Sequence, residues 1–260
     1  MKKKKILCFD IITIFPHVFG DYFSTSIIER AQKKGLIKIK IHNLRDFTTD
    51  KHKTVDDRPC GGGPGMIVKA DIIYKAIVAL AKLKIKNKKL KIVLLTPAGK
   101  QFNQKIAQRY SRLDRLILIS GHYEGVDARV EKFVDEKISI GPYVLTGGEL
   151  PAMTIVDAVT RLIPDVIKKE SLEEETFNKM RINADQISAD QRGKNQRKSA
   201  AANKVSREYP QYTRPPVLTI RDKSGKIKVL KVPKVLLSGN HQKIREWRVR
   251  KLKIVRNERF

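Results

Sequence analysis

The chain has 260 residues, a length typical of one large domain or two smaller ones. Hydrophobic residues make up 41% of it, which is enough for a substantial core and excludes a wholly disordered protein. The 55 lysine and arginine residues outnumber the 27 aspartate and glutamate residues, and the net charge of +28 indicates a polyanionic partner, most simply a nucleic acid.

The positive charge is concentrated towards the C-terminal end. From residue 178 onward the chain carries 23 basic and 6 acidic residues, a net charge of +17 over 83 residues. A lysine-rich proteome that places Lys at any permissive surface position would account for part of this excess. The concentration at one end favours the nucleic-acid interpretation.

The cysteines and the first residues bear on the compartment. Cys8 and Cys60 provide neither a disulfide framework nor the spacing of metal ligands, so we expect no metal site and a reduced, cytoplasmic environment. The opening MKKKKILCFDIITIF has the basic start and apolar run of a signal peptide. Asp10 interrupts this run and no small-residue cleavage site follows, so we expect a strand. No stretch has the roughly 18 apolar residues that would span a bilayer, and no membrane partner is expected.

Strands and helices are predicted to alternate along the first two thirds of the chain. Apolar runs and alternation predict strands at 5–15, 36–44, 91–96, 115–120 and 138–141. Helices are predicted at 26–34, where Ser26 and Glu29 suggest a capping box, and at 71–83, 103–110, 127–136 and 153–163. This order predicts an α/β fold with a mostly parallel sheet covered on both faces, which we place in residues 1–167.

The rest of the chain divides into a linker and a small module. Residues 168–207 are polar, contain RGKNQRKSAAANK and are predicted to be a flexible linker. Residues 208–260 are predicted to form a small, basic, mostly helical C-terminal domain. Its last helix begins near SGNH and places Ile244 and Trp247 on one face.

Three loops with small residues follow predicted strands: TPAGK (96–100), SGHYEGVD (120–127) and SIGPYVLTGGE (139–149). Neither the dinucleotide motif G-x-G-x-x-G nor a P-loop is present. In an open α/β sheet such loops line the ligand crevice, and small residues let the backbone approach a flat ligand. One such loop is more often a tight turn than a site, but three in succession favour a pocket for an adenine-bearing cofactor.

Long motifs along the chain resemble one enzyme family. In order they are DIITIFP, RDFTTDKHKTVDDRP with GGGPGM, SG-YEGVD-R, SIG-YVLTGGELPAM, YTRP and LLSGNH--IR-WR. Over nearly the whole chain except the linker, the sequence is similar to the bacterial tRNA (guanine-N1)-methyltransferases, the TrmD type of the SPOUT class. The resemblance implies a deep trefoil knot in the α/β domain and an obligate homodimer whose active sites contain both subunits. It also implies that S-adenosylmethionine donates a methyl group to N1 of the guanosine immediately 3′ of the anticodon.

The resemblance assigns cofactor-binding residues as well. The segments that match Gly121 and 140–145 hold S-adenosylmethionine bent in the family, largely through main-chain groups, and Thr96 and Pro97 form another wall. Gly147 and Gly148 would at the same time shape the turn into the next helix. The implied set is Thr96, Pro97, Gly121, Tyr123, Ile140, Gly141, Pro142, Tyr143, Val144, Leu145, Gly147 and Gly148.

Methylation of neutral guanine at N1 requires a base for the N1 proton and a cation for the charge that grows on O6. The resemblance assigns the base to Glu175 and the cation to Arg161. It places Glu124 at the guanine edge and Asp56 at the target or its neighbour. Two of these keep a structural alternative: Arg161 suits a helix C-terminus, and Glu124 could cap backbone amides. The family type leads us to expect help from Mg²⁺, which the sequence itself does not show.

The basic C-terminal residues are expected to bind tRNA phosphates, while the pocket provides selectivity. His241, Arg245 and Arg248 are the candidate phosphate contacts, with a solvated helix face as the alternative for each. Glu208, just before YPQYTRP, is a further candidate substrate contact and stands where the family has Asp.

Other departures from the family pattern leave alternatives open. Glu175 stands where the family has Asp, which lengthens the reach of the carboxylate by a methylene. Pro142 replaces the usual Asp of SIGDY and removes a backbone donor. The linker is longer than in the family, which raises its ordering cost only slowly. The alternatives are a tRNA-binding SPOUT relative with lost or altered catalysis, and a methyltransferase that acts on another RNA.

Overall fold

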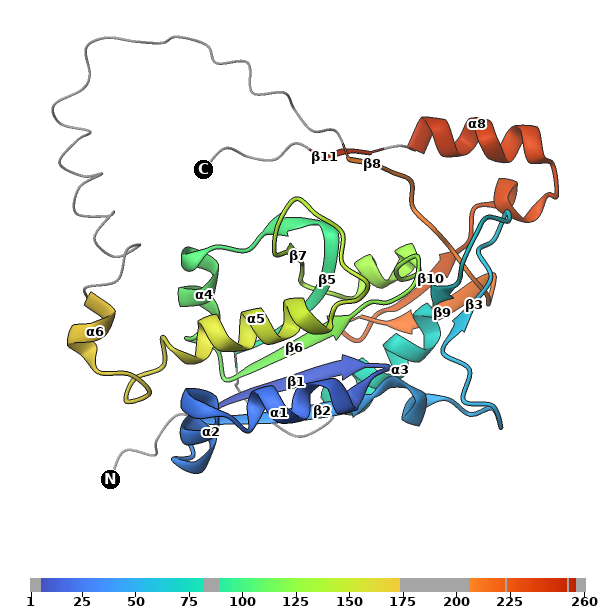
Figure 1. Cartoon of the computed structure of the whole chain (residues 1–260). Helices are drawn as coiled ribbons and strands as arrows, with labels where there is room; N and C mark the ends of the chain where they lie inside the picture. Colours follow the sequence, from blue (N-terminus) through green and yellow to red (C-terminus); the bar gives the residue numbers. More distant parts are fainter. Residues whose placement is uncertain (1–5, 82–88, 174–205, 223, 252, 256–260) are drawn as a thin grey trace, which may run out of the picture.

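The computed structural model describes residues 6–81, 89–173, 206–222, 224–251 and 253–255 (Figure 1). A five-stranded sheet with the strand order β2-β1-β6-β5-β7 forms the centre of the fold. Every pairing between neighbouring strands of this sheet is parallel, as predicted. The strands are β1 (Leu7–Thr13), β2 (Ile37–Asn43), β5 (Leu90–Gln101), β6 (Arg115–Ser120) and β7 (Glu136–Ser139).

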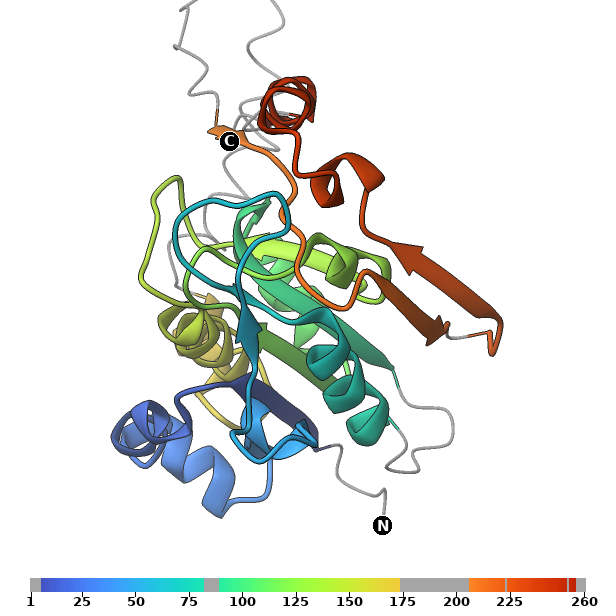
Figure 2. The same cartoon turned by 90° about the vertical axis from the view of Figure 1, so that its right-hand side faces the viewer.

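Apolar side chains on both faces of the sheet build two cores. Phe9 and Leu118 contribute to the core that is covered by the 3₁₀ helix η1 (Pro16–Phe19) and by helices α1 (Gly20–Phe23), α2 (Ser26–Lys33), α4 (Gln104–Tyr110) and α5 (Glu149–Thr160). Ile12 and Ile117 contribute to the core on the other face, under α3 (Ala70–Ala81) and the 3₁₀ helices η2 (Leu44–Phe47) and η3 (Ala128–Lys132). Figure 2 shows α3 and α5 on opposite sides of the sheet, which confirms the predicted α/β layers.

Three local predictions are corrected by the structure. The sequence predicts a loop at 96–100, but β5 continues through it: Leu95 and Lys100 both lie opposite Ile138, so the residues between them bulge out of the ladder. The sequence predicts an α-helix at 127–136, where the structure has only the 3₁₀ helix η3. The capping box is also wrong, because Thr25 is the N-cap of α2 and makes no side-chain capping bond.

The C-terminal part contains strands as well as a helix. Strands β9 (Val217–Arg221) and β10 (Ile227–Lys231) form an antiparallel hairpin, and β8 (Ser206–Glu208) pairs with β11 (Lys253–Val255). The hairpin contributes Leu218 and Ile220 to the core beneath α3. Helix α8 (His241–Lys251) and the 3₁₀ helix η4 (Lys234–Leu237) instead share a separate small core, against which Cys60 and Tyr212 also pack.

Some predictions fall where the structure gives no answer. Helix α6 (Lys169–Glu173) opens the predicted linker, but most of that linker, including Glu175, lies outside the described residues. The trefoil knot stays a prediction. In the described part of the chain, no helix combines the length and apolar character needed to cross a membrane.

Candidate active site

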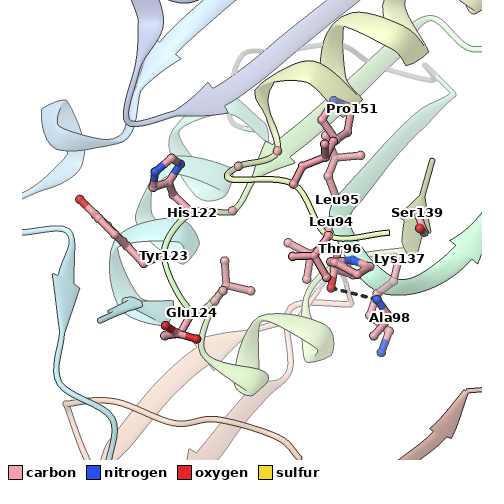
Figure 3. A pocket seen from close by; sticks show the side chains of 18 of the residues that line it. Leu94, Leu95, Thr96, Ala98, His122, Tyr123, Glu124, Lys137, Ser139 and Pro151 are labelled. Atoms are coloured by element: carbon pink, nitrogen blue, oxygen red, sulfur yellow. Dashed lines mark hydrogen bonds between the residues drawn. The ribbon is translucent and has the colours of Figure 1, made fainter. Parts of the chain in front are cut away.

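A pocket of about 400 Å³ lies at the carboxyl ends of β5, β6 and β7 (Figure 3). Its walls come from 94–98 in β5, from 121–128 after β6, from 137–139 in β7, and from 140 and 143–148 between β7 and α5. Residues 209–211 of the C-terminal part close a further side. The three segments that the sequence singled out therefore converge on one pocket, although the first is a bulge in a strand and not a loop.

Close backbone contacts hold two of these segments together. The Gly148 N–H donates to the Gly121 carbonyl at 2.8 Å, and Ser120 Oγ donates to the Gly148 carbonyl at 3.2 Å. A Cβ on Gly148 would lie 2.6 Å from the Ser120 Cα, and one on Gly147 would lie 2.2 Å from the Glu149 Oε2. Only glycine lets the chain approach this closely.

The predicted cofactor residues lie at this pocket with two exceptions. Gly141 and Pro142 do not line it: Gly141 is buried behind the wall, where it exchanges hydrogen bonds with the Ser139 hydroxyl, and Pro142 is exposed. The departure from the family at Pro142 therefore lies outside the pocket wall. The predicted residues that do line it are Thr96, Pro97, Gly121, Tyr123, Ile140, Tyr143, Val144, Leu145, Gly147 and Gly148.

Glu124 is the predicted substrate residue that lines the pocket, and Figure 3 shows it beside Tyr123. Its N–H donates to the Met66 carbonyl at 3.1 Å, which fixes the backbone. Its side chain lies so close to Gly65 that a Cβ there would be 2.4 Å from the Glu124 Cγ. In the part of the chain that the structure describes, this carboxylate caps no backbone amide, so the geometry favours its availability to a ligand.

Arg161 is at the far end of the helix that begins at the pocket. Gly148, the N-cap of α5, lines the pocket, whereas Arg161 is the C-cap. The helix has 12 residues and is therefore about 18 Å long. A single copy of the chain does not bring Arg161 to the pocket.

The other predicted substrate residues lie elsewhere in the chain. Asp56 is in the short strand β3 (Asp56–Asp57), which pairs with β4 (Ile67–Val68), and it does not line the pocket. His241 and Arg245 are exposed on α8, and Glu208 is in β8. Arg248 is half-buried, and its guanidinium contacts the carbonyl oxygens of Gly61 and Gly62 and the Tyr209 ring.

A buried acid supports the glycine wall, and sequence reasoning does not identify its role. Glu149, only 8% exposed, lies in the first turn of α5, where the helix dipole favours a negative charge. Its Oε1 accepts a hydrogen bond from Thr13 Oγ1 at 2.8 Å, and its Oε2 lies 3.7 Å from the pocket-lining His122 Nδ1. The carboxylate is thus hydrogen-bonded to the end of β1 and lies beside the loop after β6.

The segment 209–216, which we call the strap, forms the wall that sequence reasoning missed altogether. Tyr209, Pro210 and Gln211 of the strap line the pocket. The buried Asp127 carboxylate accepts hydrogen bonds from Arg129 and from the Thr213 N–H, the latter at 2.7 Å. Arg129 in turn donates to strap carbonyls, including that of Thr213 at 2.7 Å. The motif YPQYTRP was the signal for this segment, but nothing in its spacing indicates what it packs against.

Two further charge pairs lie at the edge of the site. Arg214 of the strap donates to both oxygens of Asp57, and these hydrogen bonds lower the pKa of that carboxyl below its ordinary value. Lys137 pairs with Glu131 at 2.8 Å, and both line the pocket. The apolar walls, the close backbone and the few charged groups together suit an adenine-bearing cofactor with a charged tail.

Comparison with known proteins places these features in a family. Residues 7–259 match the family described as tRNA (Guanine-1)-methyltransferase TrmD. The chain is 48% identical over 244 residues to the tRNA (guanine-N(1)-)-methyltransferase of Dictyoglomus turgidum, covering 94% of this chain and 84% of that protein. It is 43% identical over 258 residues to that of Clostridioides difficile, covering 97% and 95%. The crystal structure of tRNA (m1G37) methyltransferase from Aquifex aeolicus matches with a TM-score of 0.57 and 34% identity, covering 94% of this chain and 88% of that one.

Proposed function

Since this chain belongs to the tRNA (guanine-1)-methyltransferase TrmD family, we propose that it methylates N1 of the guanosine immediately 3′ of the tRNA anticodon, with S-adenosylmethionine as the donor. The family and the tRNA methyltransferase activity implied by the sequence motifs are confirmed by the comparisons. The observation that carries the proposal for this chain is the convergence of three strand-end segments on one pocket.

The pocket residues fit the donor. S-adenosylmethionine supplies a sulfonium-bound methyl group when it is bound. The aliphatic side chains of Leu94, Leu95 and Ile138 offer an apolar wall, and the glycine wall lets backbone groups lie close to a flat ring. Glu131 and Lys137 offer charged groups for the polar tail.

The substrate chemistry is assigned to four residues. Glu124, at the rim, accepts hydrogen bonds from the guanine edge, and Asp56 contacts the target or its neighbour. Glu175 removes the N1 proton, and Arg161 stabilises the negative charge that develops on O6. Since Arg161 lies about 18 Å along α5 from the pocket of its own chain, we propose that it serves the pocket of a second copy.

Exposed apolar side chains support a homodimer in which the copies share their sites. Val144 in the pocket wall is 78% exposed, and Leu150 in the first turn of α5 is 58% exposed. Val18 and Tyr22, on η1 and α1, are exposed as well, and the Tyr22 hydroxyl donates to Asp157 of α5. Large exposed apolar groups around one helix are typical of a protein interface.

The remaining assignments complete the proposal. Residues 1–167 form the methyltransferase domain, 168–207 a linker and 208–260 a basic domain that binds tRNA in the cytoplasm. His241 and Arg245, exposed on α8, contact phosphates, and Glu208 contacts the substrate. Among the described residues, no group of three or more His, Cys, Asp or Glu side chains could hold a metal ion, so no residue is assigned to Mg²⁺.

The proposal is tested by transfer of labelled methyl from S-adenosylmethionine to two tRNA transcripts. One carries guanosine and the other adenosine in the position 3′ of the anticodon. Label on the guanosine transcript alone, mapped to N1, is the expected result. Label on both transcripts at another site would favour a methyltransferase of different specificity, and tRNA binding without label would favour a relative that has lost catalysis.

A further inference from the structure

Helix α8 has one face in solvent and another against the rest of the chain. His241 and Arg245 are exposed. Ile244 is buried against Leu236 and Val232, and the Trp247 ring lies 6.3 Å from the ring of Tyr212 in the strap. The basic helix is therefore fixed to the strap.

Arg248 extends this inward face. Its Nη2 donates to the Gly61 carbonyl at 3.2 Å and also to the Gly62 carbonyl. Its Cζ lies 4.9 Å from the centre of the Tyr209 ring, a cation–π contact. Its Nη2 is thus held by carbonyl oxygens and its plane lies near an aromatic ring, while its buried Nε has no hydrogen-bond partner among the described residues.

The two groups that Arg248 contacts, the Tyr209 ring and the loop with Gly61 and Gly62, both adjoin the pocket. Tyr209 lines the pocket directly. Gly61 and Gly62 belong to the loop that continues to Gly65, and Gly65 packs against the Glu124 side chain. Gly61 and Gly65 have positive φ values of 84° and 69°, so the path of this loop depends on backbone conformations that other residues rarely adopt.

The strap is anchored mainly beyond Tyr209. The Ala128 N–H donates to the Gln211 carbonyl at 2.7 Å, and the Cys60 N–H donates to the Tyr212 carbonyl at 2.7 Å. Asp127 binds the Thr213 N–H. Tyr209 lies between these anchors and strand β8, whose last residue Glu208 pairs with Lys253 of β11, so main-chain bonds fix the path of the chain and the contact with Arg248 fixes the ring.

From this geometry we infer that Arg248 is a positioning residue of the cofactor pocket. It holds the Tyr209 ring at the pocket wall and fixes the loop that packs against Glu124, and it thereby links helix α8 to cofactor binding. The inference rests on the proposed function, in which the pocket holds S-adenosylmethionine. It gives Arg248 a role different from the phosphate contact that the sequence predicts.

The test measures the dissociation constant of S-adenosylmethionine by calorimetry in the absence of tRNA. Arg248→Met and Tyr209→Leu are each expected to weaken binding about threefold to tenfold. Arg248→Lys, which keeps the charge but lacks the planar guanidinium near the Tyr209 ring, should recover only part of the loss. The double variant should bind S-adenosylmethionine no more weakly than Arg248→Met alone does, because both changes remove the same contact, the one between Arg248 and Tyr209. Arg250→Met, an exposed arginine of the same helix, is the matched control and should bind as the wild type does.

The inference would be overturned if Arg248→Met bound S-adenosylmethionine as tightly as the wild type does. It would also be overturned if the losses in binding free energy of the two single variants added up in the double variant. Arg248→Met could instead leave cofactor binding unchanged and lower the affinity for tRNA, with the slope of log affinity against log salt concentration reduced by about one. That result would identify Arg248 as a phosphate contact. Tyr209→Leu keeps the test decisive if Arg248→Met fails to fold. A wild-type protein that binds no S-adenosylmethionine would overturn the proposed function and the inference with it.

Discussion

Gly148 and Arg161 occupy opposite ends of α5, so that the same helix begins at the pocket wall and ends about 18 Å away from it. The first residue shapes the cofactor pocket, and the second is the proposed cation for the transition state. One chain does not bring them together, and this separation is the reason for proposing that Arg161 serves the pocket of a second copy.

Gly148→Ala is expected to weaken S-adenosylmethionine binding about tenfold or more. The new Cβ would lie 2.6 Å from the Ser120 Cα, so the wall must shift to accept it. Calorimetric titration of the cofactor checks this. Gly20→Ala is the control, because a Cβ at Gly20 meets nothing within 4 Å. Equal affinity in both variants would contradict the assigned wall.

Glu124→Gln is expected to lower kcat/KM for tRNA by roughly 10-fold to 100-fold and to leave cofactor affinity unchanged. A carboxylate accepts from the guanine 2-amino group while N1–H is left to the base, whereas an amide can present a mismatched N–H group there. Steady-state methyl transfer with varied tRNA measures the change. Glu29→Gln, on α2 and away from the proposed tRNA-binding helix, should behave as the wild type. Loss of cofactor affinity in Glu124→Gln would place this side chain at the donor instead.

Glu175→Gln is expected to lower the single-turnover rate of methyl transfer by about 10²-fold to 10⁴-fold, because the amide cannot accept the N1 proton. Binding of tRNA and of the donor should persist. Glu175→Asp, the residue typical of the family, should retain activity. If Glu175→Gln stays active and Glu208→Gln does not, the base is Glu208.

Asp10→Asn is expected to destabilise the fold by about 3–5 kcal/mol, since it leaves the buried Arg115 without its charged partner. Burial opposes ionisation of Asp10, but hydrogen bonds from His42 and Arg115 outweigh it and lower the carboxyl pKa below 3.8. A lowered pKa contributes stability that is present above pH 4 and is lost as the pH falls through the folded-state value.

Urea unfolding at several pH values tests the Asp10 prediction. The wild-type free energy of unfolding should fall steeply below about pH 4, and the Asp10→Asn profile should be flatter there. The exposed Asp21→Asn is the control and should follow the wild type. Parallel profiles for wild type and Asp10→Asn would show that this carboxyl does not couple folding to pH.

The sequence predicts those parts of the fold that depend on local pattern. The apolar runs of β1 and β6 report burial directly, so these strands are where they are expected, and the periodicity of α5 identifies the helix, which begins at Glu149 and not at the predicted residue 153. The bulge before Lys100 depends on pairing with Ile138, which is far along the chain. The 3₁₀ helix at Arg129 is fixed by the strap. Both contacts join residues far apart in the sequence, so no local pattern predicts them.

The same distinction applies to the site. Gly121 and Gly148 are identifiable from motif spacing, because short glycine segments after strands meet at one edge of a parallel sheet. Tyr209 comes to the pocket only through the folding of the C-terminal part back onto η3, and Arg248 turns inward only because Ile244 and Trp247 fix the rotation of α8. These are long-range effects that residue identity does not reveal.

Subunit complementation tests the shared catalytic site most directly. Arg161→Ala and Gly148→Ala chains are co-expressed with different tags, and the mixed dimers are purified for methyl-transfer assays at a donor concentration well below the dissociation constant of Gly148→Ala, where each variant alone has little activity. Each mixed dimer contains one intact pocket next to an intact Arg161 from the other chain, so we predict that activity returns. A mixed dimer of the wild-type chain and a chain with both changes contains no complete shared site and should stay inactive. Mixed dimers that form but transfer no methyl group would contradict the account.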